Sequence, residues 1–148
     1  MRQRRQHERR RALRGGTRRQ FSRRRAPLAA LAFSDPATLT CIANDFGFEE
    51  VFARQVEAHG RRGDLLLCLS TSGTSENVVR AARTARERGL VTVALLGRGG
   101  GKLATEVDVA MIVPAAVTSA RIQEVHLLLL HAATEGIEAI VATGGGGD

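Results

Sequence analysis

The stretch Leu65–Asn77, LLLCLSTSGTSEN, decides how this chain folds. Its five largely apolar residues predict a buried strand, and the residues after Ser75 have the pattern of a helix. Hydroxyl side chains and one glycine lie between the two. The free N–H groups and the positive dipole end of a helix's first turn attract anions. The serine loop, Ser70–Ser75, is therefore predicted to bind phosphate; the alternative is a turn whose hydroxyls only cap their own helix.

Strand and helix patterns alternate along the body of the chain. The predicted strands cover 27–33, 64–69, 90–96 and 108–113, and the predicted helices cover 37–43, 49–59, 75–88 and 119–141, with a loop at 97–101 and a helical turn at 102–106. Strands that are apolar on both faces indicate an α/β fold, a parallel sheet with helices on both faces. Ligands of such sheets bind beyond the carboxyl ends of the strands, where the serine loop falls.

The positive charge of the chain is confined to its beginning. Residues 1–25 contain twelve Arg and one Glu (+11), whereas residues 26–148 contain ten Lys and Arg and fourteen Asp and Glu (−4), which together give +7. Residues 1–25 are predicted to be a disordered arginine-rich arm, because they hold few apolar side chains and repel one another. Such an arm is either a nucleic-acid tether or a stretch from a wrong start or shifted frame. We favour the second. The body also lacks a set of aromatic residues for stacking on bases, which argues against a nucleic-acid-binding protein.

The remaining composition indicates a cytoplasmic protein. Cys41 and Cys68 stand alone in apolar settings, which predicts buried free thiols in a reducing compartment. No apolar run approaches the roughly 20 residues that span a bilayer, so no membrane segment is expected.

Three segments, taken together and in order, resemble the sugar isomerase (SIS) domain family, and its phosphoheptose isomerase branch in particular. They are LTCIANDFGF at Leu39–Phe48, DLLLCLSTSGTSEN at Asp64–Asn77 and ARIQEVHLLLLH at Ala120–His131, and GGGKLA at Gly99–Ala104 fits as well. The resemblance covers about residues 27–141 and implies a three-layer, flavodoxin-like or Rossmann-like fold. It also implies isomerisation of sedoheptulose 7-phosphate to D-glycero-D-manno-heptose 7-phosphate, a step toward bacterial surface heptose, by a cytoplasmic homotetramer.

The resemblance carries roles to particular residues. The family's phosphate-binding residues match Ser70, Thr71, Ser72 and Ser75, and its sugar-contacting pair matches Asn44 and Asp45. The alternative for that pair is an Asx turn that ends a helix. A glutamine and a histidine that bind zinc in the family match Gln123 and His131, and His131 also matches a histidine that transfers protons. A histidine in LLLLHAA could instead be an inert core residue, and His126 does not occupy a matching position.

The spacing of the two zinc residues bears on how one ion could be held. Gln123 and His131 are eight residues apart, a rise of about 12 Å on a helix, whereas first-shell bonds to zinc are about 2 Å long. Either the helix or its long side chains accommodate this distance, or the site is shared between subunits.

Two motifs that open the family's domain have no counterpart ahead of residue 27 in this sequence. These are a Gly-Asn-Gly-Gly-Ser loop and a His-x-x-x-Glu helix that carries a zinc ligand and the catalytic glutamate; His7 and Glu8 are adjacent instead. We expect residues 26–148 to be the C-terminal two-thirds of a SIS domain, without its first strand, preceding helices and two zinc ligands. Two functions follow: an isomerase of which this chain is an incomplete form, or a non-catalytic module that binds a sugar phosphate or a replication-initiator-type protein.

Overall fold

The computed structural model describes residues 27–114 and 118–144. Residues 35–126 form one compact unit, and residues 1–34 with 127–148 form a second. The predicted arm, residues 1–25, lies outside the described residues, so its disorder stays a prediction.

A parallel sheet organises the unit formed by residues 35–126. Its strands are β1 (Leu65–Ser70), β2 (Val91–Gly97) and β3 (Val109–Val113), in the order β1-β2-β3. Cys68 stands opposite Ala94 in the first pair, and Leu95 stands opposite Met111 in the second. All three strands start and end within one residue of the predicted bounds, and the fold class is confirmed.

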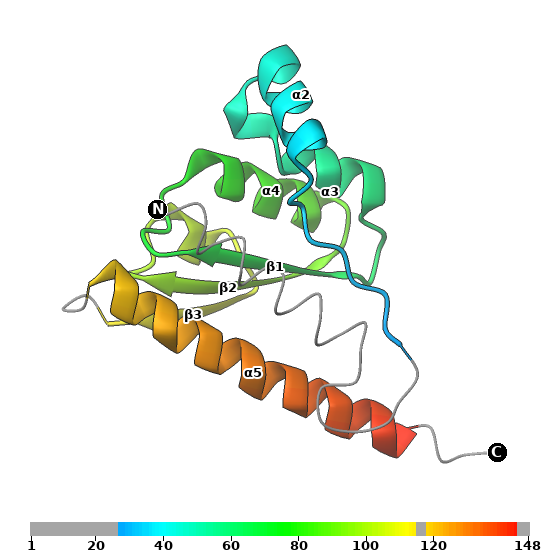
Figure 1. The fold of residues 1–148 in the computed structure, drawn as a ribbon, viewed down its shortest axis with the longest axis vertical. Helices are drawn as coiled ribbons and strands as arrows, with labels where there is room; N and C mark the ends of the chain where they lie inside the picture. Colours follow the sequence, from blue (N-terminus) through cyan, green and yellow to red (C-terminus); the bar gives the residue numbers. More distant parts are fainter. Residues whose placement is uncertain (1–26, 115–117, 145–148) are drawn as a thin grey trace. The chain divides into compact units, whose positions relative to one another are not determined.

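Helices lie on both faces of this sheet. The helical elements of the chain are α2 (Pro36–Phe46), η1 (Phe48–Glu50), α3 (Ala53–His59), α4 (Glu76–Glu87), η2 (Lys102–Thr105) and α5 (Ser119–Gly144), of which α5 runs on past residue 126. Figure 1 shows α3 and α4 on the same side of the strands. Leu96 of β2 faces the side that α4 covers. Because side chains alternate along a strand, Gly97, the next residue, belongs to the opposite face. A Cβ at Gly97 would meet Ile122 of α5, so the first turns of α5 cover that second face.

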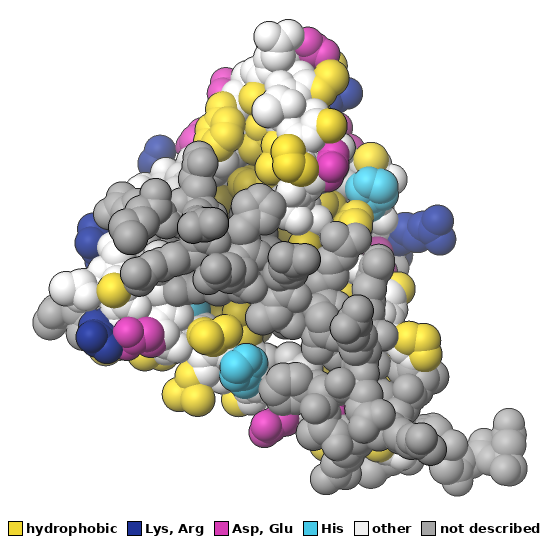
Figure 2. Space-filling view, viewed as in Figure 1, with side chains coloured by type: hydrophobic (Ala, Val, Ile, Leu, Met, Phe, Trp, Pro, Cys, Tyr) yellow, Lys and Arg dark blue, Asp and Glu magenta, His cyan; other side chains and the backbone are white. Residues whose placement is uncertain are grey.

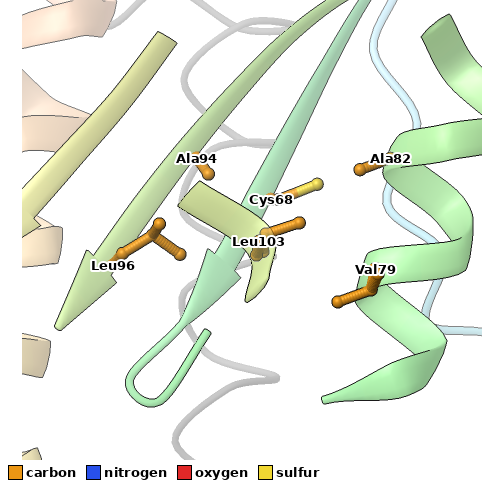
Figure 3. Close-up of a cluster of buried hydrophobic side chains, with 6 residues drawn as sticks. All are labelled: Cys68, Val79, Ala82, Ala94, Leu96 and Leu103. Atoms are coloured by element: carbon orange, nitrogen blue, oxygen red, sulfur yellow. The ribbon is translucent and has the colours of Figure 1, made fainter. Parts of the chain in front are cut away.

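The core between the sheet and α4 explains why α4 forms where the sequence predicts it. Its centre consists of buried residues from β1, β2, α4 and η2 (Figure 3): Cys68, Val79, Ala82, Ala94, Leu96 and Leu103. Val79, Ala82 and Ala85 recur at helical spacing and have no exposed surface. Small alanines on α4 let the helix approach the sheet closely, and this fixes where its first turn, next to the serine loop, stands.

Two predicted elements are wrong. Residues 27–33 form no strand, and the sheet formed by the described residues contains only β1, β2 and β3. A strand persists only when its N–H and C=O groups are paired, and an apolar run by itself supplies no partner. The helix predicted at 49–59 divides into η1 and α3, because Gly47 has a φ of +95° and starts a 3₁₀ turn at Phe48.

The helix α5 departs from the expectation that no segment is apolar enough to span a membrane. Ser119–Ala142 passes that criterion on length and composition, with a mean hydropathy of 1.4. The core helix of a soluble protein passes the same test when it is mostly buried, whereas 22% of this window is buried. Some of the buried side chains of this helix are polar, among them His126, Thr134 and Glu138.

Candidate functional site

The serine loop connects β1 to α4 and is held by its own hydroxyls. Ser70 is buried, and its Oγ accepts a hydrogen bond from the Gly73 N–H at 3.0 Å. Ser72 Oγ accepts from Thr74 Oγ1 at 3.1 Å. An accepting hydroxyl keeps its own proton available. Ser70 and Ser72 can therefore shape the loop and still donate to an anion.

Ser75 occupies the N-cap position of α4 without capping it. Its backbone is extended and its C=O accepts from the Val78 and Val79 N–H groups, but its side chain makes no hydrogen bond to the helix. A serine at this position normally satisfies an N–H of the first turn. The Ser75 hydroxyl is exposed and free of that pairing, and it leaves the N–H groups of Glu76 and Asn77 uncapped, as an anion site requires. The alternative of a purely self-capping turn does not describe Ser75.

A second loop, Gly97–Gly101, packs its backbone against the serine loop; we call it the glycine loop. Gly73 has a φ of +64°, and a Cβ on it would stand 1.7 Å from the Gly100 carbonyl oxygen. A Cβ on Gly101 would stand 2.6 Å from the Ser72 carbonyl oxygen. The Leu103 N–H donates to the Gly73 carbonyl oxygen at 2.9 Å. The conformation of the serine loop therefore depends on glycine in both loops.

The beginning of α5 is attached to the carboxyl end of β2. His126 is fully buried, and its Nε2 lies 3.0 Å from the Leu96 carbonyl oxygen. Arg98 Nη2 donates to Ser119 Oγ at 2.9 Å. These contacts fix the turns that carry Gln123, which is buried. The structure accordingly brings α5 and the serine loop to the same end of β2, with His126 at the contact between α5 and that strand.

Asn44 and Asp45 lie in the last turn of α2, both exposed. Asn44 Nδ2 donates to Asp45 Oδ1 at 2.8 Å, and the Cys41 thiol donates to Asp45 Oδ2 at 3.8 Å. The prediction that Cys41 is buried is wrong, because α2 turns this residue outward; Cys68 is buried as predicted. Phe46 and Phe48 are exposed beside the pair, and Figure 2 shows hydrophobic and acidic side chains together over α2.

Charged side chains link this region to the start of α4. Arg80 of α4 pairs with Glu50 of η1 and with Glu76 in the first turn of α4. The hydrogen bond to Glu50 raises the pKa of the Arg80 guanidinium above its ordinary value. The carboxylate of Glu76 interacts favourably with the positive end of the α4 dipole but would repel a bound phosphate. The ion pair with Arg80 offsets part of that negative charge and so lowers the repulsion.

The predicted zinc ligands differ in their surroundings. Gln123 is buried within the unit of residues 35–126, whereas His131 is exposed and lies beyond that unit. Within residues 27–114 and 118–144, no three His, Cys, Asp or Glu side chains converge as a metal site. The described residues of one chain therefore do not fit a complete zinc shell.

Comparisons with known proteins show the family to which the chain belongs. A family model described as SIS domain matches residues 11–97, more than half of the chain. The chain belongs to the SIS domain family. The match starts inside the segment assigned to the arm, so residues 11–25 are counted within the SIS match.

Individual relatives of this SIS chain are phosphoheptose isomerases. Those of Fusobacterium nucleatum subsp. nucleatum and Bordetella avium are 48% and 50% identical to it, over 82% of the chain. The chain spans 62% and 63% of their lengths. The solved phosphoheptose isomerase of Neisseria gonorrhoeae is 42% identical with a TM-score of 0.80, over 87% of this chain and 68% of that one. That of Francisella tularensis is 36% identical with a TM-score of 0.79, over 84% and 67%.

Sequence reasoning did not single out the glycine loop's part in the site or the bond between Arg98 and Ser119. A signal for the first exists in the sequence, because Gly97 and Gly99–Gly101 follow a strand that neighbours the serine loop. The second joins residues 21 positions apart and has no local signature.

Proposed function

We propose that this chain binds the phosphate of a ketose or heptose phosphate at the serine loop. The observation that carries the proposal is Ser75, whose hydroxyl stands at the start of α4 without bonding to that helix. Thr71 and the donating hydroxyls of Ser70 and Ser72 complete the phosphate subsite. Sedoheptulose 7-phosphate is the proposed substrate, since the relatives at about half identity are phosphoheptose isomerases.

The proposed reaction is the isomerisation of that ketose phosphate to D-glycero-D-manno-heptose 7-phosphate. The reaction moves a proton between C1 and C2 and needs a positioned acid–base group. We assign that role to His131 and sugar contacts to Asn44, Asp45 and Gln123. The family's His-x-x-x-Glu pair precedes the serine loop, and no histidine ahead of that loop in this sequence has a glutamate four residues on; the same spacing recurs at His131 and Glu135 of α5. This observation favours, as a second candidate, a module that binds a sugar phosphate or a protein partner without turning the sugar over.

Zinc, a homotetramer and a cytoplasmic location belong to the same proposal. Gln123 and His131 would each supply one zinc ligand. The described residues of the chain do not provide the remaining ligands, which would therefore come from elsewhere. A bound zinc ion would polarise the sugar's oxygen atoms. Assembly with a second copy provides one source of those ligands.

Turnover and binding separate the two candidates. The full chain is incubated with sedoheptulose 7-phosphate and zinc, and product formation is followed, while calorimetry measures binding of the sugar phosphate. Conversion establishes the isomerase, and binding without conversion establishes the module. Ser72→Ala should weaken binding and leave the fold intact, and an unchanged affinity would contradict the phosphate assignment. Absence of sugar-phosphate binding by the unaltered chain would refute the isomerase and the sugar-phosphate module, and would leave the second candidate only as a module for a protein partner.

A further inference from the structure

Arg98 has a backbone conformation that suits glycine better than arginine. Its φ is +52°, and it is the single non-glycine residue with a positive φ among the described residues. Gly99, Gly100 and Gly101, which follow it, also have positive φ. The left-handed conformation is unfavourable for a residue with a Cβ. An arginine in this conformation, within a run of glycines, indicates that its side chain has a specific role.

The side chain of Arg98 is attached to the start of α5. Its Nη2 donates to Ser119 Oγ at 2.9 Å, so the bond joins the glycine loop to the first residue of that helix. Thr118 and Ile122 anchor the same turn, since the Ile122 N–H donates to the Thr118 carbonyl oxygen at 3.0 Å. The loop is therefore fixed to a regular, well-anchored element at this end.

At its other side the glycine loop touches the serine loop. A Cβ on Gly97, the residue before Arg98, would stand 2.9 Å from the Thr71 carbonyl oxygen. Gly100 and Gly101 stand against Gly73 and Ser72 with equally little room. Backbones packed this closely cannot move independently, so a shift of the glycine loop changes where the serine loop presents its donors.

We propose that Arg98 is a positioning residue of the phosphate site, holding the glycine loop against the serine loop through its bond to Ser119. The proposal rests on the phosphate site described under the proposed function. Arg98 acts through the two loops and does not itself contact the phosphate.

Arg98→Gly tests this without straining the fold. Glycine adopts the left-handed conformation readily, so the thermal midpoint should stay the same or rise. Ser119→Ala removes the acceptor and keeps the positive charge, and thereby separates the hydrogen bond from simple attraction of an anion by Arg98. Each variant should raise the Kd for sedoheptulose 7-phosphate, or for inorganic phosphate as a second probe, by about three- to tenfold.

The double variant provides the decisive comparison. When the two side chains act only through their mutual bond, Arg98→Gly with Ser119→Ala weakens binding no more than either single change. Amide hydrogen exchange at Gly73 should speed up in all three variants without any ligand. Unchanged affinity, multiplying effects or unchanged exchange at Gly73 would overturn the positioning role. If the unaltered chain binds neither probe, the phosphate site fails, and the exchange at Gly73 still decides whether Arg98 positions the loop.

Discussion

At the scale of single residues, Gly73 and Gly63 separate backbone strain from steric exclusion. Both have a positive φ, +64° and +89°, but an added Cβ at Gly63 meets nothing within 4 Å, whereas at Gly73 it meets the Gly100 carbonyl oxygen at 1.7 Å. Gly63→Ala should cost about 1–2 kcal/mol of unfolding free energy. Gly73→Ala should cost more than about 3 kcal/mol, because the loops must part as well. Urea denaturation of both variants measures the difference, and equal losses would contradict the close packing of the loops.

Two helix N-caps distinguish a residue kept for stability from one available to a ligand. Asp35 caps α2, accepting from the Thr38 N–H at 2.8 Å and from Thr38 Oγ1 at 2.7 Å. Asp35→Ala should therefore lower the free energy of unfolding, because the cap of α2 is lost. Ser75→Ala should change stability by less than about 0.5 kcal/mol, since the Ser75 side chain does not cap α4.

The same Ser75→Ala variant should bind sedoheptulose 7-phosphate about tenfold more weakly, because a hydroxyl that donates to a charged phosphate is lost. Calorimetric titration beside thermal denaturation measures both quantities. A drop in stability with unchanged affinity would show that Ser75 serves the helix and not the ligand.

What could be predicted at this scale depended on whether the signal is local. The serine loop is legible because hydroxyls, a glycine and a following helix stand next to one another in the sequence. The exposure of Cys41 is not, since apolar neighbours surround it in the sequence while α2 turns it outward. Arg98 needs a partner 21 positions away, which no window of sequence contains.

At the scale of elements, Asp108 attaches the start of β3 to β2. Its Oδ2 accepts from the Thr92 N–H and from Thr92 Oγ1, both at 2.7 Å. The backbone hydrogen bond from Thr92 is the largest cause that lowers the pKa of the Asp108 carboxyl below its ordinary value. A carboxyl with a lowered pKa stabilises the fold above about pH 4, and this contribution is lost as the pH falls through the folded-state pKa.

Asp108→Asn should therefore lower stability at pH 7 and have progressively less effect below about pH 4. Denaturation curves recorded from pH 7 to pH 3 measure the difference between the variant and the unaltered chain. Asp35→Asn is the comparison variant, because the pKa of the Asp35 carboxyl is also lowered but that carboxyl caps a helix and does not join two strands. A difference at Asp108 that stays constant over this range would contradict the assignment of the stabilisation to the charged carboxylate.

Elements were predictable where local pattern and sheet pairing agree. β1, β2 and β3 are apolar runs that find parallel neighbours, and each appears within a residue of its expected position. Residues 27–33 have a similar apolar pattern but form no strand, because pairing and not hydrophobicity decides. The division of the helix at 49–59 follows from Gly47, whose positive φ a periodicity argument does not register.

At the scale of the whole molecule, the resemblance read from three short segments is matched by a SIS model over residues 11–97 and by two solved phosphoheptose isomerases. The completeness of the site is a different question. The sequence of α5 supplies two proposed zinc ligands but does not show whether one chain or two chains complete the ligand shell. The two side chains also differ in environment, since Gln123 is buried and His131 is exposed.

A shared zinc site makes a prediction that mixed oligomers can test. Gln123→Ala and His131→Ala should each lower the zinc content of the purified protein, because each removes a proposed ligand. When each ligand comes from a different subunit, mixing and reassembling the two variants creates some sites in which both side chains are intact. The mixture should then bind more zinc than either variant alone, and its zinc affinity should rise with protein concentration. A site built by one chain gains nothing from mixing, so zinc binding by the mixture equal to the mean of the two variants would contradict the shared site.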